Sequence, residues 1–361
     1  MAVPARKLRS IALFIAVNLL SIVCLLWVLL AVDFRRLLHE VAHLHWGWVS
    51  VAVLANLLSY VLQAWRWNLV LAPVAPLPLW RSVQAIYVGL FANEVLPLRS
   101  GEIIRCYLQS KWSEIPLSVT LASALIERIF DGIWLIVGLM VALRWVHLPG
   151  VIRYAGFFLA LLILVCGALL AVAMYWREQA LDALLNARWF GWVHVLIKDL
   201  HLIGHSRYLY FAFFVSLPFF VLQIVPMFAV LRAYGGLNHF PVIASLTLAV
   251  ILRLNAVLPQ APGNIGTFNA ATVLVLRIFR ADAFVPQGPQ LPGRRRLRVS
   301  VFEEMARGFS LILWAIVTLP LLIAGFVAVA LTEMNLGELH RGARSTFQDR
   351  DRVTVTPDDA V

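Results

Sequence analysis

The chain has 361 residues, of which 61% are hydrophobic and 14% are charged, whereas a soluble domain is about 45 to 50% apolar. A net charge of +11 could indicate nucleic-acid binding, but the lysines and arginines are scattered between apolar runs, so no nucleic acid is expected as a partner. We therefore expect an all-α polytopic membrane protein. The three cysteines have no paired spacing, so neither a disulfide framework, a metal site nor a cofactor is expected.

Six apolar runs are long enough to cross a bilayer, which takes about 20 helical residues. Arg6, Lys7 and Arg9 precede the first run, and this arrangement predicts a signal-anchor helix with a cytoplasmic N-terminus. The expected full transmembrane helices are residues 11–32, 49–71, 117–143, 152–176, 208–231 and 309–331.

Polar segments separate these runs. Residues 33–48 have the pattern of a short amphipathic helix at the membrane interface, and 177–207 that of a longer connector on the membrane surface. The connector divides the chain into membrane halves 1–176 and 208–331. Residues 282–308 are expected to form a Pro/Gly/Arg loop, and 332–361 a disordered polar tail.

Two further apolar segments, 81–112 and 241–280, are interrupted by proline and glycine. Each is expected to form a broken helix pair, either re-entrant or an ordinary turn between short spans. The order span, span, broken pair, span then occurs twice, once in residues 11–143 and again in residues 152–331. Because three is odd, the second half enters from the opposite side, which predicts an inverted repeat. One observation counts against this scheme. With a cytoplasmic N-terminus, the arginines of residues 282–308 would lie outside, whereas basic loops tend to lie in the cytoplasm.

Residues 91–131 carry a group of charges within sequence otherwise suited to lipid. An ionisable side chain at bilayer depth costs about 2.5 to 3.5 kcal/mol on insertion scales, so such groups usually pair with one another or line a cavity. An interfacial loop whose charges lie in water is the alternative. The charged residues are Glu94, Arg99, Glu102, Arg105, Glu127, Arg128 and Asp131.

His39, Glu40 and His43 fit the H-E-x-x-H motif, in which two histidines one helical turn apart bind zinc and the glutamate activates water. The motif lies just after the first span, beside Trp46 and Trp48. Interfacial histidines therefore explain it better than a metalloprotease, which would need a third ligand such as Asp131.

Four short motifs carry a resemblance to a known family. They are the R-W at Arg66 and Trp67, the N-x-x-x-P-x-R-x-G-E at Asn93, Pro97, Arg99, Gly101 and Glu102, the E-R-x-x-D at Glu127, Arg128 and Asp131, and the P-G-x-x-G at Pro262, Gly263 and Gly266. Over about residues 10–331 the chain resembles the flippase-like transmembrane domain of the lysylphosphatidylglycerol synthases.

The resemblance implies a stand-alone member without the soluble synthase domain, in a bacterial-type inner (plasma) membrane. It also implies lipid handling, with an anionic or aminoacylated phospholipid or a polyprenyl-linked lipid as partner. Asn269 stands where the family usually has an acidic residue, which weakens proton coupling there. The candidate substrate-binding residues are Asn93, Arg99, Glu102, Arg105, Glu127, Arg128, Asp131, Pro262, Gly263 and Gly266.

Three functions fit these observations. The first is a non-enzymatic translocator whose buried arginines and carboxylates hold a charged headgroup, with no catalytic residue. The second is an intramembrane enzyme, either a zinc protease using residues 39–43 or a lipid or glycolipid transferase using Glu127 and Asp131. The third is a scaffold whose charges only lock helices together. Measuring the zinc content of the purified protein would distinguish the translocator from the zinc protease.

Overall fold

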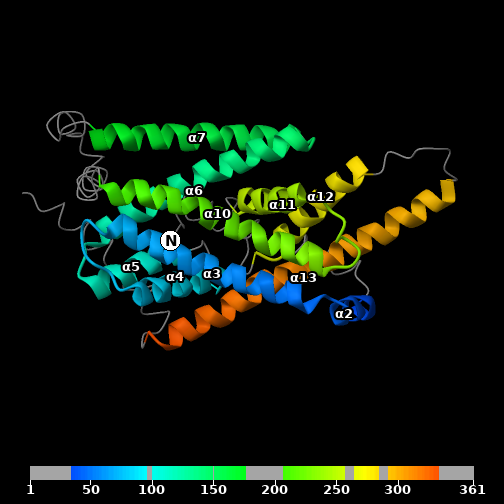
Figure 1. Ribbon diagram of the computed structural model, residues 1–361, viewed down its shortest axis with the longest axis horizontal. Helices are drawn as coiled ribbons and strands as arrows, with labels where there is room; N and C mark the ends of the chain where they lie inside the picture. Colours follow the sequence, from blue (N-terminus) through cyan, green and yellow to red (C-terminus); the bar gives the residue numbers. More distant parts are fainter. Residues whose placement is uncertain are drawn as a thin grey trace, which may run out of the picture. The chain divides into compact units, whose positions relative to one another are not determined.

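The computed structural model describes residues 34–95, 100–148, 150–175, 206–256, 264–283 and 292–332 (Figure 1). Within these ranges all regular structure is helical. The first predicted span, most of the 177–207 connector and residues 333–361 of the tail lie outside the described residues.

Ten helices are described. In the first half of the chain they are α2 (Phe34–Ala42), α3 (Trp46–Leu71), α4 (Leu79–Val95), α5 (Gly101–Ser113), α6 (Leu117–Trp145) and α7 (Gly150–Tyr175). In the second half they are α10 (Arg207–Ala233), α11 (Val242–Asn255), α12 (Thr267–Ala283) and α13 (Pro292–Ala330). Among the described residues, α3, α10 and the Phe302–Ala330 part of α13 are long and apolar enough to cross a membrane.

Proline marks several helix starts. Pro78, Pro116 and Pro241 each precede a helix by one residue, and their carbonyls accept the first backbone hydrogen bonds of α4, α6 and α11 at 3.1, 3.0 and 2.9 Å. The fixed φ of proline suits this position, where its missing N–H is not needed. Helix α5 ends at Ser113 and is followed by Glu114, which has a left-handed φ of 56°.

Two segments differ from the sequence-based expectation. Helix α2 ends at Ala42, so the interfacial helix is shorter than 33–48, and Trp46 and Trp48 belong to α3. Helix α13 begins at Pro292, so residues 292–308 are helical rather than a loop. Proline is tolerated at the first helical position, and the Arg, Leu, Glu and Met residues that follow are good helix formers.

The chain forms two compact units that both take parts of α3, α6, α7, α10 and α13. Unit 1 comprises Met1–Ser59, Asp131–Val165 and Leu217–Pro320, and unit 2 comprises Tyr60–Phe130, Cys166–Ser216 and Leu321–Val361. The core of unit 1 is a large apolar cluster that includes Leu237, Leu248, Val273, Leu276 and Phe309, all with no exposed surface.

Apolar side chains also cover the outer surfaces of the long helices. Phe158 on α7, Phe214 on α10 and Ile323 on α13 are 70%, 65% and 67% exposed. A soluble protein rarely exposes so many large apolar residues on successive turns. These faces suit contact with lipid tails, which need no hydrogen-bonding partner.

In unit 2, α4 packs directly against α5, with Gly89 and Gly101 at the point of closest approach. A Cβ on Gly89 would lie 2.8 Å from the Gly101 carbonyl oxygen, and a Cβ on Gly101 would overlap the Gly89 carbonyl oxygen. The two glycines therefore allow the backbones of the broken pair to touch.

We expect Gly101→Ala to lower the free energy of unfolding by about 1 to 3 kcal/mol, because the added methyl group forces α5 away from α4. Thermal unfolding of the detergent-purified protein measures this change. Gly47→Ala is the matched control, since a Cβ there meets nothing within 4 Å. An equal loss in both variants would contradict the close-packing argument.

Candidate functional site

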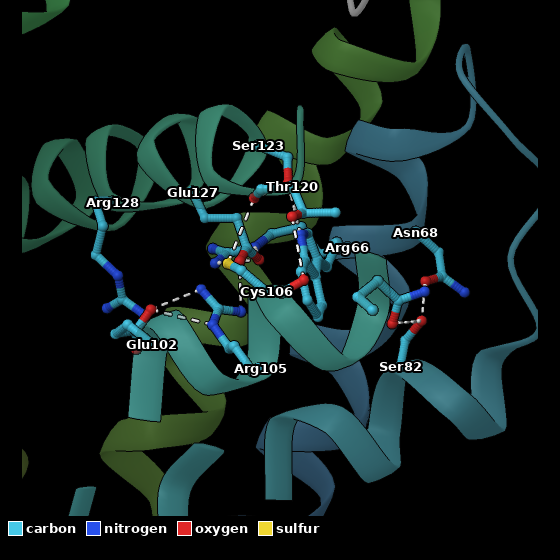
Figure 2. A network of polar contacts seen from close by, with 12 residues as sticks. Arg66, Asn68, Ser82, Glu102, Arg105, Cys106, Thr120, Ser123, Glu127 and Arg128 are labelled. Atoms are coloured by element: carbon cyan, nitrogen blue, oxygen red, sulfur yellow. Dashed lines mark hydrogen bonds and ion pairs between the residues drawn. The ribbon is translucent and has the colours of Figure 1, made fainter. Parts of the chain in front are cut away.

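Five charged side chains in unit 2 form a continuous chain of ion pairs, which we call the charged network (Figure 2). Its members are Arg66 on α3, Glu127 and Arg128 on α6, and Glu102 and Arg105 on α5. Glu127 is the central acceptor. Its Oε1 accepts hydrogen bonds from Arg66 Nε and Nη2 at 3.2 and 3.1 Å, and its Oε2 accepts one from Arg105 Nη1 at 2.9 Å.

Glu102 extends the network from Arg105 to Arg128. Its Oε2 accepts a hydrogen bond from Arg105 Nε at 3.1 Å and lies 2.8 Å from Arg105 Nη2. Its Oε1 lies 2.9 Å from Arg128 Nη2. Three arginines and two glutamates give the network a net charge of +1, and the charges alternate in sign along it.

The network is buried at one end and accessible at the other. The side chains of Arg66 and Glu127 have no exposed surface, and that of Arg105 is 3% exposed. Those of Glu102 and Arg128 are 40% and 49% exposed. A ligand can therefore approach Glu102 and Arg128 but not Arg66 or Glu127.

Neutral side chains hold the buried arginines in place. Trp67 has no exposed surface, and the guanidinium carbon of Arg105 lies 4.7 Å from its ring centroid, a cation–π contact. The Trp67 indole donates to Ser123 Oγ at 2.8 Å, and Arg66 Nη1 donates to Ser216 Oγ at 3.1 Å. Because Ser123 and Glu127 are one turn apart on α6, one face of that helix positions both arginines.

Each helix break is closed by an asparagine side chain. Asn93 Oδ1 accepts a hydrogen bond from the backbone N–H of Gly101 at 2.9 Å, where α5 begins. Asn269 Oδ1 accepts one from the N–H of Gly266 at 3.0 Å, and its amide nitrogen donates to Ser310 Oγ at 3.2 Å. Gly266 has a φ of 93°, which an L-residue rarely adopts.

The structure brings together four of the ten candidate substrate-binding residues, namely Glu102, Arg105, Glu127 and Arg128. Asn93 is occupied in closing the first break. Asp131, which is 8% exposed, and Gly266 belong to unit 1. Arg99, Pro262 and Gly263 lie outside the described residues.

The H-E-x-x-H motif lies on α2 with its glutamate in use elsewhere. The Tyr234 hydroxyl donates a hydrogen bond to Glu40 Oε2. Burial raises the pKa of Tyr234 above its usual range, and the hydrogen bond and negative charge of Glu40 raise it further. The rings of His39 and His43 stack with centroids 4.1 Å apart. Glu40 thus serves as the acceptor for a tyrosine.

Arg66 is the member of the network that the sequence analysis did not include in the site. Arg66 lies between Trp65 and Trp67, a pattern typical of a membrane interface, but it is fully buried and bound to Glu127. A sequence signal was present in the apolar run around Arg66, because a charge there needs a buried partner of opposite sign.

These features define an integral membrane protein of α-helices that carries charged side chains inside its helical packing. The family described as "Lysylphosphatidylglycerol synthase TM region" matches residues 11–285, and the chain belongs to this family. The match ends before α13. No curated protein and no solved structure matches the chain.

We expect Glu127→Gln to lower the free energy of unfolding by about 3 to 5 kcal/mol, because two guanidiniums would remain buried without their shared counter-charge. Thermal unfolding in detergent measures the loss. Glu114→Gln is the control, since this carboxylate is exposed at the end of α5 and its change should stay within about 0.5 kcal/mol. Equal stabilities of Glu127→Gln and the parent protein would show that the network is not structural.

Proposed function

We propose that the protein is a non-enzymatic translocator of lipids with an anionic headgroup. The observation that carries this proposal is the charged network, which has a net positive charge and runs from a fully buried arginine to the half-exposed Arg128. Membership of a family named for a phospholipid synthase supports a lipid as substrate.

The roles of the site residues follow from their exposure. Arg128, the most exposed arginine of the network, contacts the headgroup oxygens through its planar guanidinium. Arg105 supplies a second positive charge behind Glu102. Glu127 and Arg66 hold Arg105 in place, while the acyl chains remain among the apolar outer faces of the helices.

The enzyme alternatives have less support. Both carboxylate oxygens of Glu127 accept hydrogen bonds from arginines, and the side chain has no exposed surface, so it is poorly placed to act on a substrate. Glu40 of the H-E-x-x-H motif accepts a hydrogen bond from the Tyr234 hydroxyl.

We also propose that helices α3 to α6 and α10 to α13 form an inverted repeat. Helices α3 to α6 have 26, 17, 13 and 29 residues, and α10 to α13 have 27, 14, 17 and 39. In each set the two middle helices pack against each other. With the N-terminus in the cytoplasm of a bacterial-type cell, the first break opens to the cytoplasm and the second to the opposite side.

Labelling of single cysteines tests this topology. We expect Val95→Cys, at a position that is 48% exposed before the first break, to react with a membrane-impermeant thiol reagent only from the cytoplasmic side. We expect Ala256→Cys, at the half-buried position before the second break, to react only from the other side. The background lacks Cys24 and Cys166, while Cys106 is fully buried and its silence is checked in the parent. Labelling of both positions from one side would exclude the inverted repeat.

We expect Arg128→Lys to reduce transfer of labelled phosphatidylglycerol between the leaflets of reconstituted vesicles about tenfold. Lysine keeps the charge but loses one of two hydrogen bonds to the headgroup, which is worth about 1.5 kcal/mol or more. Accumulation in the membrane should be normal, because Arg128 is half exposed.

Arg277→Lys is the matched control for this variant. Arg277 also pairs with a glutamate, Glu303, through Nε and Nη2 at 2.8 and 2.5 Å, but it lies in unit 1 outside the charged network. Normal transfer by Arg128→Lys, or an equal loss in both variants, would remove the headgroup site from this network.

A further inference from the structure

The most buried members of the charged network share a single glutamate. Arg66, Arg105 and Glu127 are at most 3% exposed at their side chains and carry two positive charges and one negative charge. Arg105 shares the carboxylate of Glu127 with Arg66, so a second anionic group beside Arg105 offsets part of the cost of burying its charge. Glu102 supplies that group, with its Oε2 2.8 Å from Arg105 Nη2.

Glu102 holds the two arginines in the way that an oxyanion ligand would. One carboxylate oxygen contacts Arg105 and the other contacts Arg128. Phosphate and carboxylate groups bind arginines through the same pairing of oxygens with guanidinium N–H groups. The carboxylate of Glu102 therefore occupies the place that a headgroup phosphate would take between these two guanidiniums.

The two glutamates of the network differ in how easily each can be displaced from its arginine partners. Glu127 has no exposed surface and is fixed from two sides. Glu102 is 40% exposed, and its partner Arg128 is 49% exposed. Exposed ion pairs contribute at most about 1 kcal/mol. An incoming anion can thus replace Glu102 at the exposed Arg128, and Arg105 remains paired with Glu127 when Glu102 leaves.

The start of α5 adds to this preference for an anion. Glu102 is in the first turn of this helix of 13 residues, where the helix dipole favours negative charge. Ser100, which precedes the helix, makes no side-chain capping bond, and its buried hydroxyl has no hydrogen-bond partner among the described residues. This hydroxyl is a further donor at the same end of the helix.

We infer that Glu102 is a displaceable internal carboxylate that competes with the phosphate of an anionic lipid headgroup for Arg105 and Arg128. The headgroup binds as Glu102 swings out to water, and the return of Glu102 releases it. No covalent bond is made or broken in this exchange. The inference rests on the proposed function, since it assigns the release step to the same site.

Glu102→Gln tests the exchange because it keeps the shape of the side chain but removes the competing charge. Binding of short-chain phosphatidylglycerol is measured on the full chain in phosphatidylcholine nanodiscs, and transfer of the labelled lipid is measured in vesicles. We expect about tenfold tighter binding together with slower transfer. A purely structural role predicts weaker binding and a lower Tm instead.

Two further experiments identify the ligand and test whether tighter binding is specific to Glu102. Inorganic phosphate replaces the lipid in one arm, and tighter binding of phosphate alone would assign the site to free phosphate and overturn the lipid assignment. Glu303→Gln is the control variant, because it removes a glutamate that also pairs with an arginine outside the network. An equal gain in binding there would reduce the effect to net charge and overturn the inference.

The remaining outcomes separate the inference from the proposed function. If the parent protein binds and transfers phosphatidylglycerol while Glu102→Gln binds it no more tightly, only the inference fails. If neither protein binds either probe, both fail. Should Glu102→Gln not fold, Glu102→Asp retains a charge on a shorter side chain that cannot span both arginines. It must then bind phosphatidylglycerol more tightly than the parent, or the inference is wrong.

Discussion

The carboxylate of Glu127 is the interaction on which unit 2 depends. It accepts hydrogen bonds from Arg66 on α3 and Arg105 on α5 while it lies on α6, so one side chain joins three helices without any contact with water. Two guanidiniums could not be buried together without it, because like charges repel and each loses its hydration. The position of Glu127 therefore fixes the short helix α5 against the long helices α3 and α6.

The helices were largely predictable because apolar runs and proline act locally. Lipid requires every backbone group to be paired within the segment, so an apolar run long enough to span predicts a helix. Pro116 and Pro241 then mark where two of them begin. The segment that begins at Pro292 was misjudged because proline and glycine next to arginines were interpreted as a loop, although proline at a first helical position is compatible with a helix.

The pairing within the site was less predictable, since it depends on contacts between distant residues. Arg66 is 61 positions from Glu127, and no local pattern shows which carboxylate it meets. Glu102, Arg105, Glu127 and Arg128 were identified because charge is rare in such sequence. What the sequence did not provide is the order of burial, from Arg66 with no exposed surface to Arg128 at 49%. That order distinguishes the residues that hold the site from those that meet a ligand.

The two helix breaks show why the charges call for a function beyond closure. A break at membrane depth leaves backbone N–H groups that lipid cannot satisfy. Asn93 and Asn269 each accept one such N–H, at 2.9 and 3.0 Å, with a neutral amide. Closing a break therefore needs no ionised group, and the described partners of Asn269 are Gly266 and Ser310, both uncharged. The network beside the first break buries two arginines, Arg66 and Arg105, at a desolvation cost of several kcal/mol. Closure of the helix pair does not account for that cost, whereas the anionic headgroup of the proposed function does.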